Sequence, residues 1–172
     1  LKPKDFNNLN SEIKVFLDHE KYTFDSGIQS YENLQKKSSD RYEYVFPYYN
    51  FNTSLSENFW NGSVSLSSSG NNVLNNTNKL KSNITNDVAY LGSDFISRYG
   101  FKNNISIDIK NLNSLGKNNS EYKSSPQIEL MSLIDLSTSL PLTKEEEAFN
   151  NYLTPKMSLK FNPSDMKNYS DS

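Results

Sequence analysis

The stretch Tyr152-Leu-Thr-Pro-Lys-Met-Ser-Leu-Lys-Phe-Asn-Pro163 shows the pattern on which the interpretation of the whole chain depends. Between Lys156 and Phe161, polar and apolar residues alternate one by one. Successive side chains of a β-strand point to opposite faces, so the segment predicts a strand with one apolar face and one face that carries two lysines. A half-buried strand of a soluble sheet has this pattern. So has a strand whose apolar face meets lipid while its polar face meets water.

The same alternation recurs along the chain, most clearly where Ile105, Ile107 and Ile109 alternate with polar residues. No segment of about 12 residues or more has the 3.6-residue period of a helix, and polar connections join the alternating segments. We therefore predict an all-β fold, an antiparallel meander of about eight long strands. Strands of up to about 14 residues exceed the roughly five or six usual in soluble sheets. They match the roughly 9 to 11 tilted residues that cross a bilayer, which predicts a segment of a transmembrane β-barrel.

Three local predictions follow from the same pattern. The segment from Arg41 to Asn52 is expected to be a strand that alternates throughout. Four aromatic residues would then share one face of it: Tyr42, Tyr44, Phe46 and Tyr48. The Asn-rich segment from Asn71 to Asn78 is expected to be a loop, because clustered Asn favours turns. The segment from Lys144 to Glu147 is expected to be a charged loop or a single helical turn.

Composition argues against several classes of function. The chain has no cysteine, which removes disulfides, thiolate nucleophiles and Cys-ligated metals. Its net charge of -2, without a basic cluster, predicts no nucleic-acid partner. Its one histidine, His19, cannot build a His-rich metal site, and three consecutive glutamates, Glu145 to Glu147, cannot converge on a substrate as a catalytic pair would. We predict no cofactor, no metal and no enzymatic activity.

Strand parity collects charged residues on one face of the predicted sheet. The candidates for this face are Arg41, Glu43, Asp108, Lys110, Lys156 and Lys160, together with Glu129 and Asp135. The alternation alone fits two environments equally well: the solvated side of a soluble β-sandwich, or the wall of a water-filled lumen. The many tyrosines, each with an apolar body and a polar tip, suit a membrane-interface girdle and also suit a packed core.

Two prolines interrupt segments that otherwise predict good strands, namely Pro47 and Pro155. Proline cannot donate a hydrogen bond to the ladder and is usually confined to edges, strand ends and bulges. Each proline therefore either ends its strand or weakens the ladder locally within a continuous sheet.

Three motifs occur in a fixed order along the chain. Tyr31-Glu-Asn-Leu34 precedes Asp40-Arg-Tyr-Glu-Tyr-Val-Phe-Pro47, Pro126-Gln-Ile-Glu-Leu precedes Leu140-Pro-Leu142, and Leu153-Thr-Pro-Lys156 precedes Asn162-Pro-Ser-Asp-Met-Lys167. In this order and spacing they resemble the barrel region of the lipopolysaccharide-assembly outer-membrane proteins, also called organic solvent tolerance proteins. The positions that carry the resemblance are Tyr31, Glu32, Leu34, Arg41, Tyr42, Pro47, Pro126, Pro141, Leu153, Thr154, Pro155 and Pro163. Leu142 departs from it, since an aromatic residue is frequent there.

The resemblance implies a Gram-negative outer-membrane barrel that exports lipopolysaccharide and inserts it into the outer leaflet. Its implied partners are lipopolysaccharide, membrane lipids, a lipoprotein plug and periplasmic bridge proteins. Residues 1–172 would then be a partial barrel domain of middle strands, without the family's N-terminal periplasmic domain and its terminal gate strands. The chain begins at Leu1 and not at Met, and we expect it to be a piece of a longer protein.

Two other functions remain open on the sequence. One is a general outer-membrane porin or transporter barrel, which the family-like proline spacing disfavours. The other is a soluble β-sandwich or β-helix adhesin that binds carbohydrate, which would bury its apolar faces in a common core.

Overall fold

The computed structural model describes residues 7–37, 41–56, 60–76, 78–145 and 149–164, and all of the regular structure in them is β-strand. The strands are β1 (Asn8–His19), β2 (Tyr22–Asn33), β3 (Tyr42–Ser56), β4 (Gly62–Asn75), β5 (Lys79–Gly92), β6 (Phe95–Ile96), β7 (Lys102–Lys117), β8 (Gln127–Ser139), β9 (Leu142–Glu145), β10 (Asn150–Leu153) and β11 (Lys156–Phe161).

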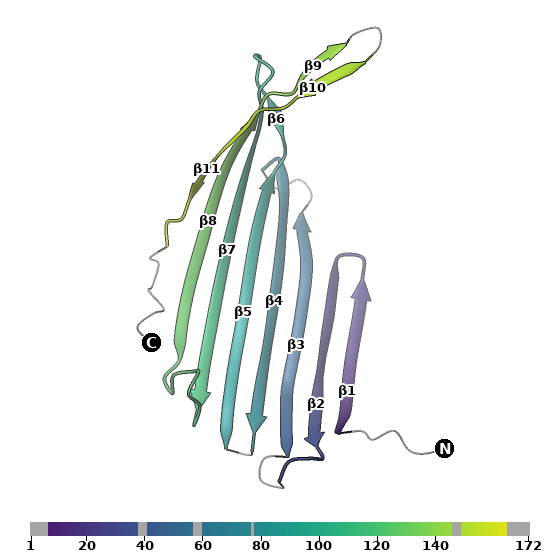
Figure 1. Ribbon diagram of the computed structural model, residues 1–172, viewed down its shortest axis with the longest axis vertical. Helices are drawn as coiled ribbons and strands as arrows, with labels where there is room; N and C mark the ends of the chain where they lie inside the picture. Colours follow the sequence, from purple (N-terminus) through teal and green to yellow (C-terminus); the bar gives the residue numbers. More distant parts are fainter. Residues whose placement is uncertain (1–6, 38–40, 57–59, 77, 146–148, 165–172) are drawn as a thin grey trace, which may run out of the picture. The chain divides into compact units, whose positions relative to one another are not determined.

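The main sheet has the strand order β1-β2-β3-β4-β5-β7-β8-β11, and the short β6 pairs with β7 (Figure 1). β9 and β10 form a separate two-stranded sheet between β8 and β11 in the sequence. Strands that follow one another in the sequence are neighbours in the sheet, and the pairs β1/β2, β2/β3 and β8/β11 are antiparallel. The predicted all-β antiparallel meander is therefore confirmed. No helix long and apolar enough to cross a membrane occurs in the part of the chain described above.

The chain divides into two compact units, which are described separately below. Unit 1 comprises Leu1–Thr53, Leu66–Asp87 and Asn111–Glu129, and unit 2 comprises Ser54–Ser65, Val88–Lys110 and Leu130–Ser172. Unit 1 holds the hairpin β1/β2 together with its pairing to β3. Unit 2 holds the pairing of β8 with β11 and the small hairpin β9/β10.

Among the described residues no hydrophobic side chain is buried, so neither unit has a conventional core. In the part of the chain that the structure describes, the buried residues are four glycines: Gly62, Gly70, Gly92 and Gly116. Large apolar side chains stay exposed, including Ile13 at 73% and Met157 at 70%. A single layer of sheet explains this, because only a residue without a side chain can be covered when no second layer packs against it.

Tyrosine rings lie over the strand glycines. A Cβ on Gly70 would meet Cε1 of Tyr49 at 2.6 Å, and a Cβ on Gly27 would meet the hydroxyl of Tyr48 at 2.8 Å. The ring replaces the packing that a glycine cannot supply, as aromatic residues do beside glycines in other sheets. Much of the tyrosine content therefore serves the sheet itself.

Replacing Gly27 with alanine is expected to destabilise the sheet by about 1–3 kcal/mol, the usual cost of overpacking. The new Cβ would lie 2.5 Å from the backbone oxygen of Ile13, which cannot move without displacing β1. The lower entropy of the unfolded alanine variant offsets only about 0.4–1 kcal/mol, so the clash decides the sign. Urea unfolding followed by circular dichroism measures the effect. Ser30→Ala on the same strand is the control, and equal unfolding midpoints for the two variants would contradict this account.

The side chains of β3 do not alternate between the two faces along the whole strand. The prediction that Tyr48 shares a face with Tyr42 and Tyr44 was therefore wrong. Gly27 of β2 lies opposite Tyr48 and Gln29 lies opposite Val45, so one residue of β2 faces two residues of β3. The extra residue forms a β-bulge at Phe46-Pro47, and a bulge shifts the parity of everything after it. Tyr48 therefore shares the face of Val45 and not that of the earlier tyrosines. The proline does not end its strand, because the bulge tolerates its missing N–H.

Three further segments differ from their predicted structure: two that were predicted as connections and one that was predicted as a single strand. The Asn-rich segment is strand up to Asn75, and Asn72 accepts a hydrogen bond from Ser82 Oγ on the neighbouring strand at 2.6 Å. Cross-strand pairing thus overrides the turn preference of Asn. Lys144 and Glu145 end β9, whereas Glu146 and Glu147 lie outside the described residues. The closing segment forms two strands, β10 and β11, separated at Thr154-Pro155.

Candidate functional site

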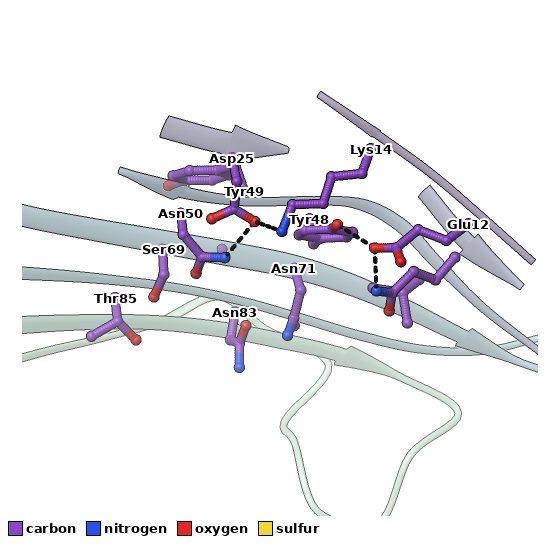
Figure 2. A pocket seen from close by; sticks show the side chains of 13 residues that line it. Glu12, Lys14, Asp25, Tyr48, Tyr49, Asn50, Ser69, Asn71, Asn83 and Thr85 are labelled. Carbon is purple, nitrogen blue, oxygen red and sulfur yellow. Dashed lines mark hydrogen bonds and ion pairs between the residues drawn. The ribbon is translucent and has the colours of Figure 1, made fainter. Parts of the chain in front are cut away.

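Unit 1 presents a polar hollow of about 490 Å³ on one face of the sheet (Figure 2). The Glu12 carboxylate lies at one end and accepts hydrogen bonds from Gln29 Nε2 at 2.9 Å and from the Tyr48 hydroxyl at 2.6 Å. Figure 2 shows the Lys14 side chain reaching toward Asp25, with which it forms an ion pair at 3.3 Å. We call this surface the polar face.

Strand register brings these groups together. Glu12 lies directly opposite Gln29, and Asp25 lies opposite Asn50, whose Nδ2 donates to the Asp25 carboxylate at 3.3 Å. The bulge then turns Tyr48 onto the same face, where it reaches Glu12 across β2. Sequence analysis missed the cluster because its members are far apart in the chain. The alternation of β1 places Glu12 and Lys14 on one face, but it identifies the cluster only when the register with β2 is known.

The chemistry of this hollow is that of a hydrated, charge-balanced surface. Each of its carboxylates has a lysine, tyrosine or amide partner, and further amide and hydroxyl groups come from Asn71, Asn83 and Thr85 (Figure 2). Paired charges and amides form hydrogen bonds with sugar and phosphate groups through water or directly. In the described residues no three His, Cys, Asp or Glu side chains come together as a metal site would require.

A second hollow in unit 1, of about 680 Å³, contains two of the predicted polar-face residues, Arg41 and Glu43. Arg41 directly precedes β3, and its Nε lies 2.6 Å from Oε1 of Glu32. Glu32 is the register partner of Tyr42, while Glu43 pairs with Tyr31. The Arg41 side chain therefore contacts a carboxylate on the face of β3 that carries Tyr42, and not on the face that carries Glu43. The alternation of β3 does not predict this contact, because Arg41 lies outside the strand.

Unit 2 has a hollow of about 510 Å³ beside β8 and β11, and Lys156 lines it. Lys102 and hydroxyl groups from Ser137, Ser139 and Ser158 line it as well. The Lys156 ammonium and the hydroxyls suit an anionic, hydroxyl-rich ligand such as a phosphorylated sugar, whereas the Lys102 ammonium is already paired with Asp94 at 2.8 Å.

Lys160 faces the same way as Lys156 along β11, and it pairs with Asp135 on β8 at 3.8 Å. Leu159 of β11 and Leu136 of β8 lie opposite each other, and both point to the face opposite that of the lysines. The remaining predicted charged residues lie outside the residues that line these three hollows: Asp108 and Lys110 in β7, and Glu129 in β8.

The second face of unit 1, opposite the polar face, is not uniformly apolar. A row of hydrogen bonds crosses four strands: Ser68 Oγ donates to Asn86 Oδ1 at 2.7 Å, and Asn86 Nδ2 donates to Asn111 Oδ1 at 3.1 Å. Asn111 Nδ2 then donates to the Glu129 carbonyl at 3.2 Å. We call this the amide row. It corrects the expectation that the face opposite the charges holds only apolar and aromatic residues.

The positions that carry the family resemblance fall at strand boundaries and in strands. Tyr31 and Glu32 lie near the end of β2, Leu34 follows β2, Tyr42 begins β3, and Pro47 lies in the bulge of β3. Pro126 directly precedes β8, and Pro141 lies between β8 and β9. Leu153 ends β10, Thr154 and Pro155 separate β10 from β11, and Pro163 follows β11. The four other prolines among these positions, Pro126, Pro141, Pro155 and Pro163, thus lie where a ladder ends, which is their usual position.

In comparisons with known proteins, no protein-family model matches the chain and no curated protein matches it.

Proposed function

We propose that the chain is part of a bacterial outer-membrane β-barrel that exports lipopolysaccharide and inserts it into the outer leaflet. The observation that carries the membrane part of the proposal is a single-layer sheet in whose described residues no hydrophobic side chain is buried. In unit 2, Leu159 is 64% and Met157 70% exposed on one face, while Lys156 and Lys160 occupy the other. A sheet with one apolar and one charged face is what a membrane barrel requires.

The substrate part of the proposal rests on the motif resemblance and on the chemistry of the polar hollows. Lysine and serine side chains beside β8 and β11 suit the phosphate and sugar groups of a lipopolysaccharide head. The acyl chains would stay near the wall while the head moves through water. The same resemblance supplies the proposed protein partners, an outer-membrane lipoprotein plug and periplasmic bridge proteins. The activity is transport, with no bond made or broken by the protein.

Fractionation of cells tests the membrane part. The intact gene product is expected in the outer-membrane fraction and in solution only with detergent, because its apolar face is uncovered. Recovery as a compact monomer from the aqueous fraction would contradict the proposal.

Charge reversal of both lysines on the charged side of β11, Lys156→Glu with Lys160→Glu, tests the substrate part. Surface lipopolysaccharide is expected to fall several-fold and sensitivity to hydrophobic antibiotics to rise, because two cations that would meet phosphate become repulsive. A double variant at exposed connections, Lys21→Glu with Lys123→Glu, carries the same change in net charge and is expected to behave as the wild type. Normal export by the β11 variant at normal protein levels would refute the assignment.

A soluble carbohydrate-binding sheet is the second candidate, and the amide row favours it. Rows of Asn and Ser side chains are unusual against hydrocarbon and common where sugars bind. Under this alternative a second layer would cover the apolar side chains, and the fractionation experiment separates the two functions.

A further inference from the structure

One connection of unit 2 exposes an unusual concentration of aromatic side chains. Within and around the β5–β7 connection, Phe95 is 61%, Tyr99 70% and Phe101 42% exposed, and Ile96 is 73% exposed. Trp60, the only tryptophan of the chain, precedes β4 and is 83% exposed. We call these five residues the aromatic rim.

The backbone beneath the aromatic rim is held in place. The Tyr90 hydroxyl donates to the Trp60 carbonyl at 2.9 Å, which joins the end of β5 to the connection before β4. Asn103 Nδ2 donates to the carbonyls of Phe101 at 3.0 Å and Phe95 at 3.4 Å. The polar backbone groups are thus satisfied within the protein while the rings stay outside. Such a segment presents aromatic side chains and does not bury them.

Three charged side chains belong to this segment: Asp94, Arg98 and Lys102. Lys102 pairs with Asp94 at 2.8 Å, and this ammonium, with Asn104, holds the pKa of the Asp94 carboxyl below its usual range. The ion pair therefore persists at neutral pH. Arg98 is exposed and lies over the ring of Tyr99, 4.7 Å from the ring centre, and donates to the Tyr99 hydroxyl. The exposed guanidinium group of Arg98 therefore lies beside the rings of the aromatic rim.

We propose that the aromatic rim lies in the headgroup layer of a lipid bilayer and that Arg98 contacts a lipid phosphate there. This inference rests on the proposed membrane function. It adds where along the strands the hydrocarbon layer of the bilayer ends, namely at the aromatic rim. Trp and Tyr gather at this layer because their rings are apolar and their polar tips stay hydrated. Arginine pairs with phosphate through its planar set of N–H donors.

The apolar surface next to the rim supports a bilayer as its occupant. A Cβ on Gly92 would meet the side chain of Ile105 at 2.8 Å and the Tyr90 hydroxyl at 3.3 Å, so the base of the rim is continuous with the isoleucine face of β7. A layer of hydrocarbon over that face would end at the rings. A protein partner on the rim alone would leave the isoleucine face uncovered.

Trp60 fluorescence tests the proposal directly, since no other tryptophan contributes. The full chain is folded into phosphatidylcholine vesicles that contain lipids brominated at one defined depth, and circular dichroism verifies the β-structure. Trp60 emission is expected to shift to the blue and to be quenched most by bromines near the glycerol end of the acyl chains. Arg98→Glu is expected to reduce the blue shift. Emission as in water, insensitive to every brominated lipid, would overturn the proposal, and so would strongest quenching at the chain ends.

A second probe separates this inference from the proposed function. In the Trp60→Phe background, Leu136→Trp reports from the apolar side of β8, where Leu136 is 46% exposed. Quenching of the Leu136→Trp probe without quenching of Trp60 would overturn the rim and leave the membrane function standing. Quenching of neither would overturn both. A blue shift that depends on protein concentration and not on lipid would show that a second copy covers the rim, and the proposal would then be wrong.

Discussion

Replacing Ile107 with arginine is expected to lower the free energy of unfolding of the chain in a bilayer by about 2–4 kcal/mol, the cost of an arginine near the bilayer midplane on the lipid side of a barrel. Ile107 lies in the centre of the isoleucine face of β7, on the side of the strand that faces away from Asp108 and Lys110. The cost arises because the guanidinium group loses its water and finds no counter-charge in hydrocarbon.

The neighbouring variant Ser106→Arg is the matched control. It carries the same new side chain one residue away, but it points to the side of β7 that carries Asp108 and Lys110, where water solvates the charge. Its free energy of unfolding is expected to change by less than about 0.5 kcal/mol. Urea titration of both variants in phosphatidylcholine vesicles, followed by circular dichroism, gives the comparison. Similar losses for the two variants would mean that neither face of β7 meets lipid.

The second large effect is expected at the amide row of unit 1. Asn86→Leu should cost about 1–3 kcal/mol of stability, because the half-buried Ser68 hydroxyl loses its Asn86 acceptor and keeps only the Tyr49 hydroxyl, 3.2 Å away, as a partner. The loss is expected although leucine is the more apolar residue. The lost hydrogen bonds cost more than the apolar side chain gains, because Ser68 and Asn111 each lose a partner in a half-buried position.

A double-mutant cycle distinguishes a hydrogen-bonded row from polar residues that merely lie close together. Adding Ser68→Ala to Asn86→Leu removes the hydroxyl that has lost its Asn86 acceptor, so the double variant should be more stable than the sum of the single changes predicts, by about 0.5–3 kcal/mol. Ser30→Ala with Asn86→Leu is the control pair. It joins β2 to β5, three strands or roughly 14 Å apart, and should be additive within about 0.5 kcal/mol. Additivity in both pairs would show that the row contributes nothing as a unit.

Much of the polar face could be predicted where a strand runs without interruption. Lys156 and Lys160 share a face in the structure, opposite Ser139 and Asp135 of β8, as their spacing of four residues requires. Prediction failed at Tyr48, because the bulge at Phe46-Pro47 reverses the parity of the strand after it. A bulge depends on how two strands fit together, so the alternation of one strand does not reveal it.

The amino-acid sequence by itself determined that the chain is β-structure, that its strands follow one another as a meander, and that isoleucines and charges of β7 lie on opposite sides. These properties follow from a period of two along a single strand. Only the tertiary structure decided that Glu12 meets Tyr48, that Asn72 meets Ser82, and that none of the described hydrophobic side chains is buried. Register and layering depend on contacts between residues far apart in the chain, which local alternation does not encode.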